Sequence, residues 1–130
     1  MRSEANNFPG RNEVNPEASR RCAADLYAEA GIGASDIGVA EVHDCFTITE
    51  LLMYEAAGWC DKGRAIDMVT SGDTAIDGRI PVNTGGGLVA FGHPVGATGI
   101  KQILEVYRQM KGACGDYQVC LLYTSDAADE

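Results

Sequence analysis

The sequence lacks the features that mark several large classes of protein. No apolar run approaches the roughly 20 residues of a membrane-spanning helix, and the N-terminus "MRSEANNFPG" has no apolar signal segment. Only ten Lys and Arg residues, scattered along the chain, stand against nineteen Asp and Glu, so the net charge is −9. Nucleic acids and anionic membranes bind through basic patches. We therefore expect a soluble intracellular protein that binds neither.

Paired cysteine spacings are also absent. The five cysteines include no CxxC pair, and their number is odd. Disulfide frameworks and structural zinc sites usually show such pairs, so we expect free thiols and no bound metal. Four cysteines are expected to be small buried hydrophobic residues, as free cysteines usually are: Cys22, Cys60, Cys114 and Cys120. Cys45 differs from these in its sequence neighbours, which suggest chemistry.

The 130 residues suit a single domain in which helices and strands alternate. Start and stop signals predict a helix over 16–30, which begins at a proline and is followed by Gly31. The next predicted elements are a strand over 37–43, a helix over 46–57 and a short helix or loop over 61–72. A glycine-rich loop follows, and after it we predict an amphipathic helix that ends at Gly112 and a strand over 117–123. This order is typical of an α/β fold, in which helices cover a sheet.

The predicted helix over 46–57, "FTITELLMYEAA", is apolar nearly all round. Such a helix needs cover on every side, and one chain of this length offers little cover. We therefore expect the chain to be part of a larger molecule.

The first motif whose residues suit catalysis or ligand binding is "GHPVGATG" over 92–99. Gly92 and Gly96 allow tight turns and a close approach of the backbone to a ligand, and a helix is expected to begin near Gly96. A helix N-terminus suits an anion or a developing oxyanion. His93, next to it, can donate, accept or shuttle a proton near neutral pH. The alternative is a glycine loop with an incidental surface histidine.

The second motif is "HDCF" over 43–46, at a predicted junction from strand to helix. In α/β folds reactive groups lie beyond the carboxyl ends of strands, and a thiol at a helix N-terminus ionises more readily. Cys45 is thus a candidate base or nucleophile, and His43 a candidate partner. Taken alone, the tetrapeptide also suits ordinary packing. If the two motifs converge in space, an active site becomes the better interpretation.

Together, "EVHDCFTITELLMYEAAGWC" and "VNTGGGLVAFGHPVGATG" resemble the C-terminal domain of thiolases, specifically the sterol-carrier-protein type that carries HDCF. The resemblance implies a mixed sheet covered by helices, one half of a five-layer αβαβα arrangement whose active site lies where two halves meet. It also implies acyl transfer between coenzyme A thioesters. In that chemistry His93 would activate a nucleophilic cysteine and donate to the thioester oxygen. His43 would hold the oxyanion-site water, and Cys45 would be the acid/base at the α-carbon. Gly92 and Gly96 would lie near the thioester.

The domain boundaries follow from the same comparison. Residues 1–15 are interpreted as a linker or the end of a missing N-terminal half, and residues 16–120 as the thiolase C-terminal domain. Residues 121–130 depart from the family pattern and are interpreted as an atypical, non-native tail. Without the upstream half and its nucleophilic cysteine, we expect this piece alone to be inactive.

Coenzyme A or acyl-CoA is expected as substrate, with no permanently bound cofactor. By resemblance, the full-length protein is a homodimer or homotetramer, with a small acyl-CoA-binding protein as an optional partner. The expected compartment is the cytoplasm for a prokaryotic source, and the peroxisome is an option for a eukaryotic one. Two alternatives stay open: a non-catalytic scaffold or acyl-CoA-binding subunit, and a thiolase-like lyase or aldolase partner in sterol side-chain degradation.

Overall fold

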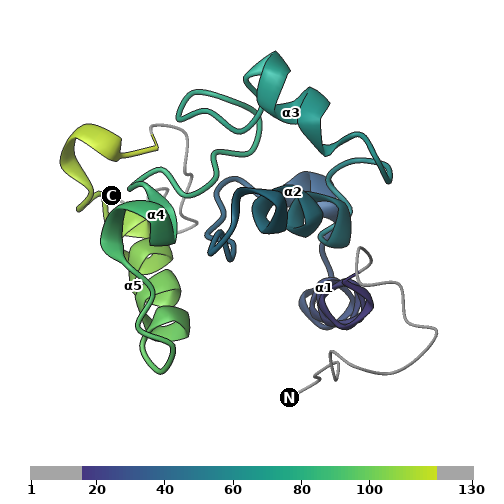
Figure 1. Ribbon diagram of the computed structural model, residues 1–130, viewed down its shortest axis with the longest axis horizontal. Coiled ribbons are helices and arrows are strands. Elements are labelled where there is room, and N and C mark those ends of the chain that lie inside the picture. The colour runs from purple at the N-terminus through teal and green to yellow at the C-terminus, as the bar shows by residue number, and fades with distance from the viewer. Residues whose placement is uncertain (1–15, 120–130) are drawn as a thin grey trace, which may run out of the picture.

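A computed structural model describes residues 16–119. Figure 1 shows its helices, which are α1 (Glu17–Ala30), α2 (Thr47–Ala56), α3 (Ala65–Ser71), α4 (Gly87–Phe91) and α5 (Thr98–Met110), with 3₁₀ turns η1 (Ala34–Asp36) and η2 (Gly115–Tyr117). The predicted linker over 1–15, the predicted tail over 121–130 and Cys120 lie outside the described residues.

The hydrophobic core lies between α2, α3 and the segment that leads to α4. Its buried members are Tyr54, Ala65, Met68, Ile80 and Val82. Helix α2 packs against both α1 and α3, which Figure 1 shows as one group, with α4 and α5 on the other side of the molecule. The core is therefore concentrated in the first group.

The first two predicted helices are confirmed. Helix α1 follows Pro16 and ends at Gly31, which is left-handed with φ 68°. Helix α2 fills the predicted range 46–57 to within a residue at each end. The residues described do not cover it on every side, because Ile48 and the N-cap residue Phe46 are 57% and 71% exposed.

The predicted mixed sheet is not confirmed within residues 16–119. The strand expected over 37–43 is reduced to a single parallel bridge between Ala40 and Val82. Ala40 donates its N–H to the Pro81 carbonyl at 2.9 Å and accepts from the Asn83 N–H at 3.0 Å. Pairing stops there because the paired segment of the same chain turns away at Asn83, whose φ is +49°. A strand needs a partner along its length, and this one loses it after one residue.

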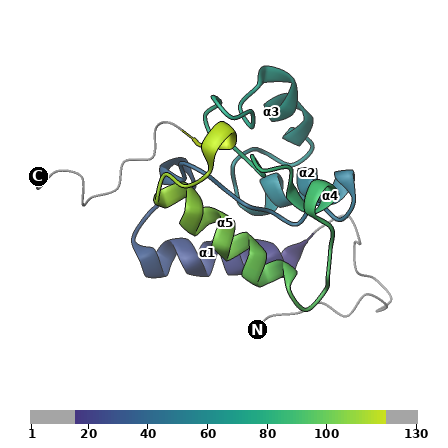
Figure 2. The same ribbon diagram turned by 90° about the vertical axis from the view of Figure 1, so that its left-hand side faces the viewer.

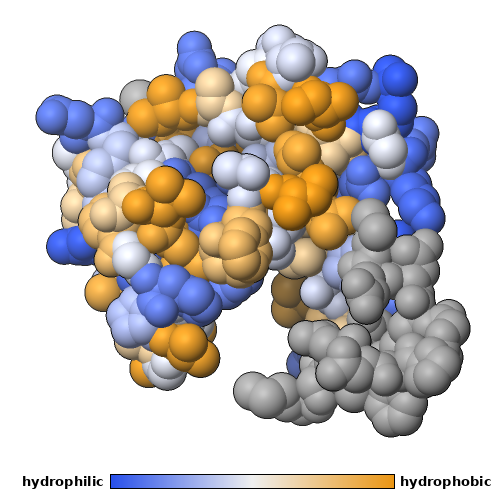
Figure 3. All heavy atoms as spheres, in the orientation of Figure 1, coloured by the Kyte–Doolittle hydropathy of each residue, from blue (hydrophilic) through white to orange (hydrophobic). Residues whose placement is uncertain are grey.

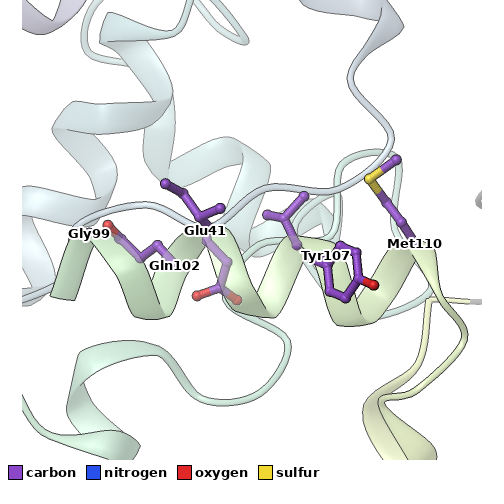
Figure 4. Close-up of a pocket in the computed structure, with 7 residues that line it drawn as sticks. Glu41, Gly99, Gln102, Tyr107 and Met110 are labelled. Carbon is purple, nitrogen blue, oxygen red and sulfur yellow. The ribbon is translucent and has the colours of Figure 1, made fainter. Parts of the chain in front are cut away.

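Helix α5 has the predicted amphipathic pattern and begins at Thr98, two residues after Gly96, as predicted. Its orientation is unexpected, because the apolar side faces outward. The apolar residues that give the helix its amphipathic pattern are 48–72% exposed: Ile100, Ile103, Leu104, Tyr107 and Met110. Figure 3 shows apolar residues gathered over α4 and α5 and again over α2. The outward face also lines a cavity of about 550 Å³, with Glu41 beside α5 in Figure 4.

Polar side chains hold the opposite face of α5. Glu105 is 4% exposed and accepts a hydrogen bond from the Tyr117 hydroxyl at 3.2 Å. Gln109 is 3% exposed, and its amide group donates to Thr84 Oγ1 and to the Tyr117 carbonyl, both at 2.8 Å. Its oxygen accepts from the Val119 N–H at 2.9 Å and from Gln118 Nε2 at 3.0 Å. Figure 2 shows the chain after α5 returning alongside the end of that helix.

The described cysteines are all free thiols. Cys114 is buried, as predicted, whereas Cys22 is exposed, so the prediction of burial is wrong for that residue. Among the helices of residues 16–119, none is long and apolar enough to cross a membrane.

The exposed face of α5 predicts self-association of the isolated chain. Changing Ile100 and Ile103, which are 71% and 72% exposed, to lysine should lower this association, because an apolar patch open to water drives it. Lysine is a good helix former, so circular dichroism should show unchanged helicity. Sedimentation velocity at matched concentrations measures the effect. The control is Ile66→Lys on α3, where Ile66 is 52% exposed. Equal association of all variants would contradict the assignment to α5.

Candidate active site

The HDCF motif is placed by its pairing with the segment before the glycine-rich loop. Val42 donates its backbone N–H to the side-chain oxygen of Asn83 at 2.9 Å. Asn83 is 8% exposed and left-handed, so its side chain continues the backbone pairing after the main chain has turned. Asparagine tolerates this conformation better than most residues. The pairing fixes the chain directly before His43.

Asp44, which the sequence analysis left without a role, joins the two motifs. It is 3% exposed, and its carboxylate accepts hydrogen bonds from the backbone N–H groups of Leu88 at 2.8 Å and Val89 at 3.4 Å. These groups lie at the start of α4, where N–H groups lack partners within the helix. Gly87 has φ +58°, and a Cβ there would overlap the Asp44 carboxylate. Glycine is therefore required for this close approach.

Helix α4 was not predicted, and it decides where His93 lies. Its last residue is Phe91, and its C-cap is Gly92, whose φ of +85° lies in the range that favours glycine. The chain then turns through Pro94 into α5. Gly96 has open space where a side chain would stand and no positive φ, so these residues alone do not require a glycine there.

The structure brings His43 and His93 together. Their ring centroids are 4.8 Å apart and their planes are inclined by 78°, an edge-to-face contact. His43 is half-buried and His93 is exposed. The Nδ1 atom of His93 lies 2.6 Å from the hydroxyl oxygen of Thr98, which is 5% exposed. Two imidazoles from loops that are distant in the sequence thus lie in contact with each other.

Cys45 lies one residue before Phe46, the N-cap of α2. It is part-buried, and its thiol makes no hydrogen bond to any group within residues 16–119. The structure therefore brings two of the three predicted residues, His43 and His93, into direct contact. The catalytic roles of all three stay predictions, as do the ligand contacts of Gly92 and Gly96.

The surroundings of the two rings are partly apolar and partly charged. His43 lines a cavity of about 370 Å³ together with residues of α1 and α2, among them Tyr27 and Met53. Glu41 lies on the same segment and pairs with Lys101 of α5 at 3.4 Å. Lys101 also lies over the Phe91 ring, 4.3 Å from its centroid. This pair links the HDCF segment to α5.

Burial raises the pKa of the Glu41 carboxyl above its ordinary value of 4.5, and Lys101 opposes part of that shift. Burial also raises the pKa of the Cys60 thiol, with a further contribution from Glu55, which makes Cys60 a poor nucleophile. No group of three or more His, Cys, Asp or Glu residues between positions 16 and 119 is arranged to hold a metal ion.

Sequence reasoning missed Asp44, Asn83 and Thr98 as supports of the site. Thr98 carried a usable signal, because it lies five residues after His93 at the start of a predicted helix. Asp44 and Asn83 act on residues more than 40 positions away, and no local pattern reveals such partners.

Comparison with known proteins identifies the family of the chain. Residues 2–125 match the family model described as thiolase C-terminal domain-like. The chain belongs to this family. The thiolase-like chain is 43% identical to sterol carrier protein 2 of Rattus norvegicus over 107 residues, 82% of this chain and 19% of that protein. It is 45% identical to an acetyl-CoA acetyltransferase of Methanothermobacter thermautotrophicus over 103 residues, 79% of this chain and 27% of that protein.

A solved structure is also similar. The Ltp2-ChsH2(DUF35) aldolase matches 82% of this chain and 27% of its own chain, with a TM-score of 0.70 and 33% sequence identity. The thiolase-like chain thus spans between about a fifth and about a quarter of the length of these proteins. The predicted resemblance to the sterol-carrier-protein type of thiolase C-terminal domain is confirmed.

Asp44→Ala should destabilise the thiolase-like protein by about 1.5–3 kcal/mol, since buried N–H groups lose a charged hydrogen-bond acceptor. Urea unfolding followed by circular dichroism measures this. Asp77→Ala, at an exposed position, is the control and should change stability by less than about 0.5 kcal/mol. If the two variants unfold at the same urea concentration, Asp44 does not hold the motifs together.

The raised pKa of Glu41 predicts a pH-dependent stability. The folded state binds the Glu41 proton more tightly than the unfolded state, so this contribution is complete below pH 4.5 and is lost as the pH rises through the folded pKa. Glu41→Gln cannot ionise, so its stability relative to the unchanged protein should increase across that range. Urea unfolding at several pH values measures the difference. Glu29→Gln, at an exposed position, should show no such trend, and a flat difference for Glu41→Gln would refute the assignment.

Proposed function

We propose that the full-length protein is a thiolase-type acyltransferase that makes or cleaves the carbon–carbon bond of a 3-oxoacyl-CoA, and that this chain supplies part of its active site. The observation that carries the proposal is the contact between His43 and His93, 4.8 Å apart at their ring centroids. Each histidine lies in the motif on which the family resemblance was based. Family membership and similarity to an acetyl-CoA acetyltransferase support the same reaction class.

The proposed reaction has two transfers. In the first, a cysteine thiol of the upstream part attacks the thioester carbon of an acyl-CoA, the carbon–sulfur bond to coenzyme A breaks, and the proton leaves with coenzyme A. In the second, a base removes an α-proton from another acyl-CoA. The resulting carbanion attacks the acyl group, the cysteine–acyl bond breaks, and the cysteine sulfur regains a proton. The products are a 3-oxoacyl-CoA and free enzyme.

This chain would supply proton transfer and charge stabilisation. His93 would accept the proton of the nucleophilic thiol and donate to the thioester oxygen. His43 would hold the water that shares the oxyanion site, and Cys45 would exchange the proton at the α-carbon. Gly92 and Gly96 would leave room for the thioester at the loop.

The exposed apolar face of α5 fits a chain that is completed by further protein. We propose that this face packs against the rest of the full-length protein, which assembles as a homodimer or homotetramer. Acyl-CoA is the proposed substrate, and a small acyl-CoA-binding protein is a proposed partner.

Similarity to an aldolase structure at 33% identity favours a second candidate, a thiolase-like lyase. A retro-aldol cleavage needs no acyl-enzyme. A base removes the hydroxyl proton, the carbon–carbon bond breaks, an aldehyde or ketone leaves, and the acyl-CoA enolate takes up a proton at its α-carbon. Product analysis separates the two activities. Thiolysis consumes free coenzyme A and yields two acyl-CoA molecules, whereas the lyase yields one acyl-CoA and a carbonyl compound. A non-catalytic scaffold would give neither.

In the full-length protein, Cys45→Ala should lower proton exchange at the α-carbon of a bound acyl-CoA by about 10²–10⁴-fold, as expected for a positioned acid/base. Acylation of the upstream nucleophile should persist. Deuterium incorporation from heavy water, followed by mass spectrometry, measures the exchange.

Two variants serve as comparisons for this experiment. Cys60→Ala removes a thiol that the proposed chemistry does not use, and exchange should continue. Cys120→Ala removes a second candidate for the acid/base role, because other thiolases use a cysteine near the C-terminus for it, and exchange should also continue. If exchange survives Cys45→Ala but disappears with Cys120→Ala, the role belongs to Cys120.

A further inference from the structure

Within residues 16–119, Thr98 is the one buried side chain that makes a hydrogen bond directly to a proposed catalytic ring. Its exposed fraction is 5%, and its hydroxyl oxygen lies 2.6 Å from Nδ1 of His93. The same oxygen lies 3.2 Å from the backbone carbonyl of Pro94, four residues earlier in the chain. The hydroxyl therefore has two neighbours and a single hydrogen to share between them.

The carbonyl of Pro94 can only accept a hydrogen bond, whereas the hydroxyl can donate one and accept others. Threonine at the start of a helix commonly donates to a carbonyl three or four residues back. When the Thr98 hydrogen is used in this way, its oxygen is left to accept from Nδ1–H of His93. In a neutral imidazole only one ring nitrogen carries hydrogen, and the hydrogen bond made by one nitrogen sets the state of the other.

We propose that Thr98 is a positioning residue that holds neutral His93 as the Nδ1–H tautomer and leaves the Nε2 lone pair free for the reaction. This inference rests on the proposed function, because it assigns the reacting nitrogen of that active site. A free Nε2 can accept the proton of a thiol and return it to an oxygen. With the hydrogen on Nε2, the neutral ring could donate there but could not accept.

The hydroxyl is also placed to fix the direction of the ring. His93 itself is exposed, in a turn between Gly92 and α5, whereas Thr98 is buried in the first turn of that helix. The 2.6 Å contact thus ties the exposed His93 ring to the first turn of α5. The edge-to-face contact with His43 constrains the same ring from another side.

The direct test is nitrogen-15 NMR of the full-length protein labelled at histidine, above the pH at which His93 becomes neutral. The His93 signals are identified by their absence in His93→Gln. We expect the hydrogen on Nδ1 in the unchanged protein and in Thr98→Ser, which keeps the hydroxyl. Thr98→Val keeps the shape but lacks the hydroxyl, so it should show a mixture of tautomers. Hydrogen on Nε2 in the unchanged protein would overturn the proposal.

Turnover gives the second measurement. Thr98→Val should lower kcat/KM by about 10–100-fold, the usual effect of removing the partner that orients a functional histidine, and Thr98→Ser should restore most of it. Thr70→Val is the matched control, because Thr70 also donates to a carbonyl four residues back, that of Ile66 at 3.1 Å, and contacts no histidine. Equal loss in Thr98→Ser and Thr98→Val would overturn the role of the hydroxyl.

The NMR result does not depend on activity. A protein without thiolysis whose His93 tautomer follows the Thr98 hydroxyl would refute the proposed function alone. An active protein whose tautomer ignores that hydroxyl would refute only the present inference. If Thr98→Val does not fold, the state of the ring in the unchanged protein and the activity of Thr98→Ser decide the question.

Discussion

The arrangement of the site depends on the buried carboxylate of Asp44. A carboxylate removed from water is costly unless hydrogen bonds replace its hydration, and here the N–H groups of Leu88 and Val89 provide them. This bond connects the segment that carries His43 to the helix that leads to His93. Gly87 must lack a side chain for it to form. The contact between the two histidines therefore depends on a hydrogen bond that neither ring makes itself.

How well the sequence predicts each element depends on how local its causes are. The ends of α1 follow from Pro16 and Gly31, and the motifs around His43 and His93 are legible as short strings. The predicted strand over 37–43 does not form because its pairing depends on a distant segment of the same chain, around Val82, which turns away at Asn83. Helix α4 went unnoticed because Asp44, distant in sequence, caps it. Nonlocal partners decide these features, and a single sequence does not display them.

Helix α5 shows a different limit. Its apolar residues recur at helical spacing, and the usual inference is that such a face packs on the core of its own chain. In the described structure the apolar face is open, and Glu105 and Gln109 are buried instead. Periodicity identifies the two faces of a helix but not what covers each of them. The chain spans 19–27% of the length of the three proteins compared above, and the proposal that this face packs against further protein rests on its exposure.

The side-chain amide of Gln109 holds α5 in place through hydrogen bonds whose donors and acceptors cannot be exchanged. Two hydrogens and two lone-pair positions are available on a glutamine amide, and all four are used, with acceptors on the nitrogen side and donors on the oxygen side. A carboxylate would lack both donors, and an apolar side chain of the same length would take this hydrogen-bond partner away from the Tyr117 carbonyl and from the Val119 N–H. The two ends of the amide are not interchangeable, so the helix and the segment after it recognise each other in one alignment only. Gln109 therefore helps to fix the register between α5 and the segment after it. A shifted alignment would place donor against donor or acceptor against acceptor, even where the shapes fit.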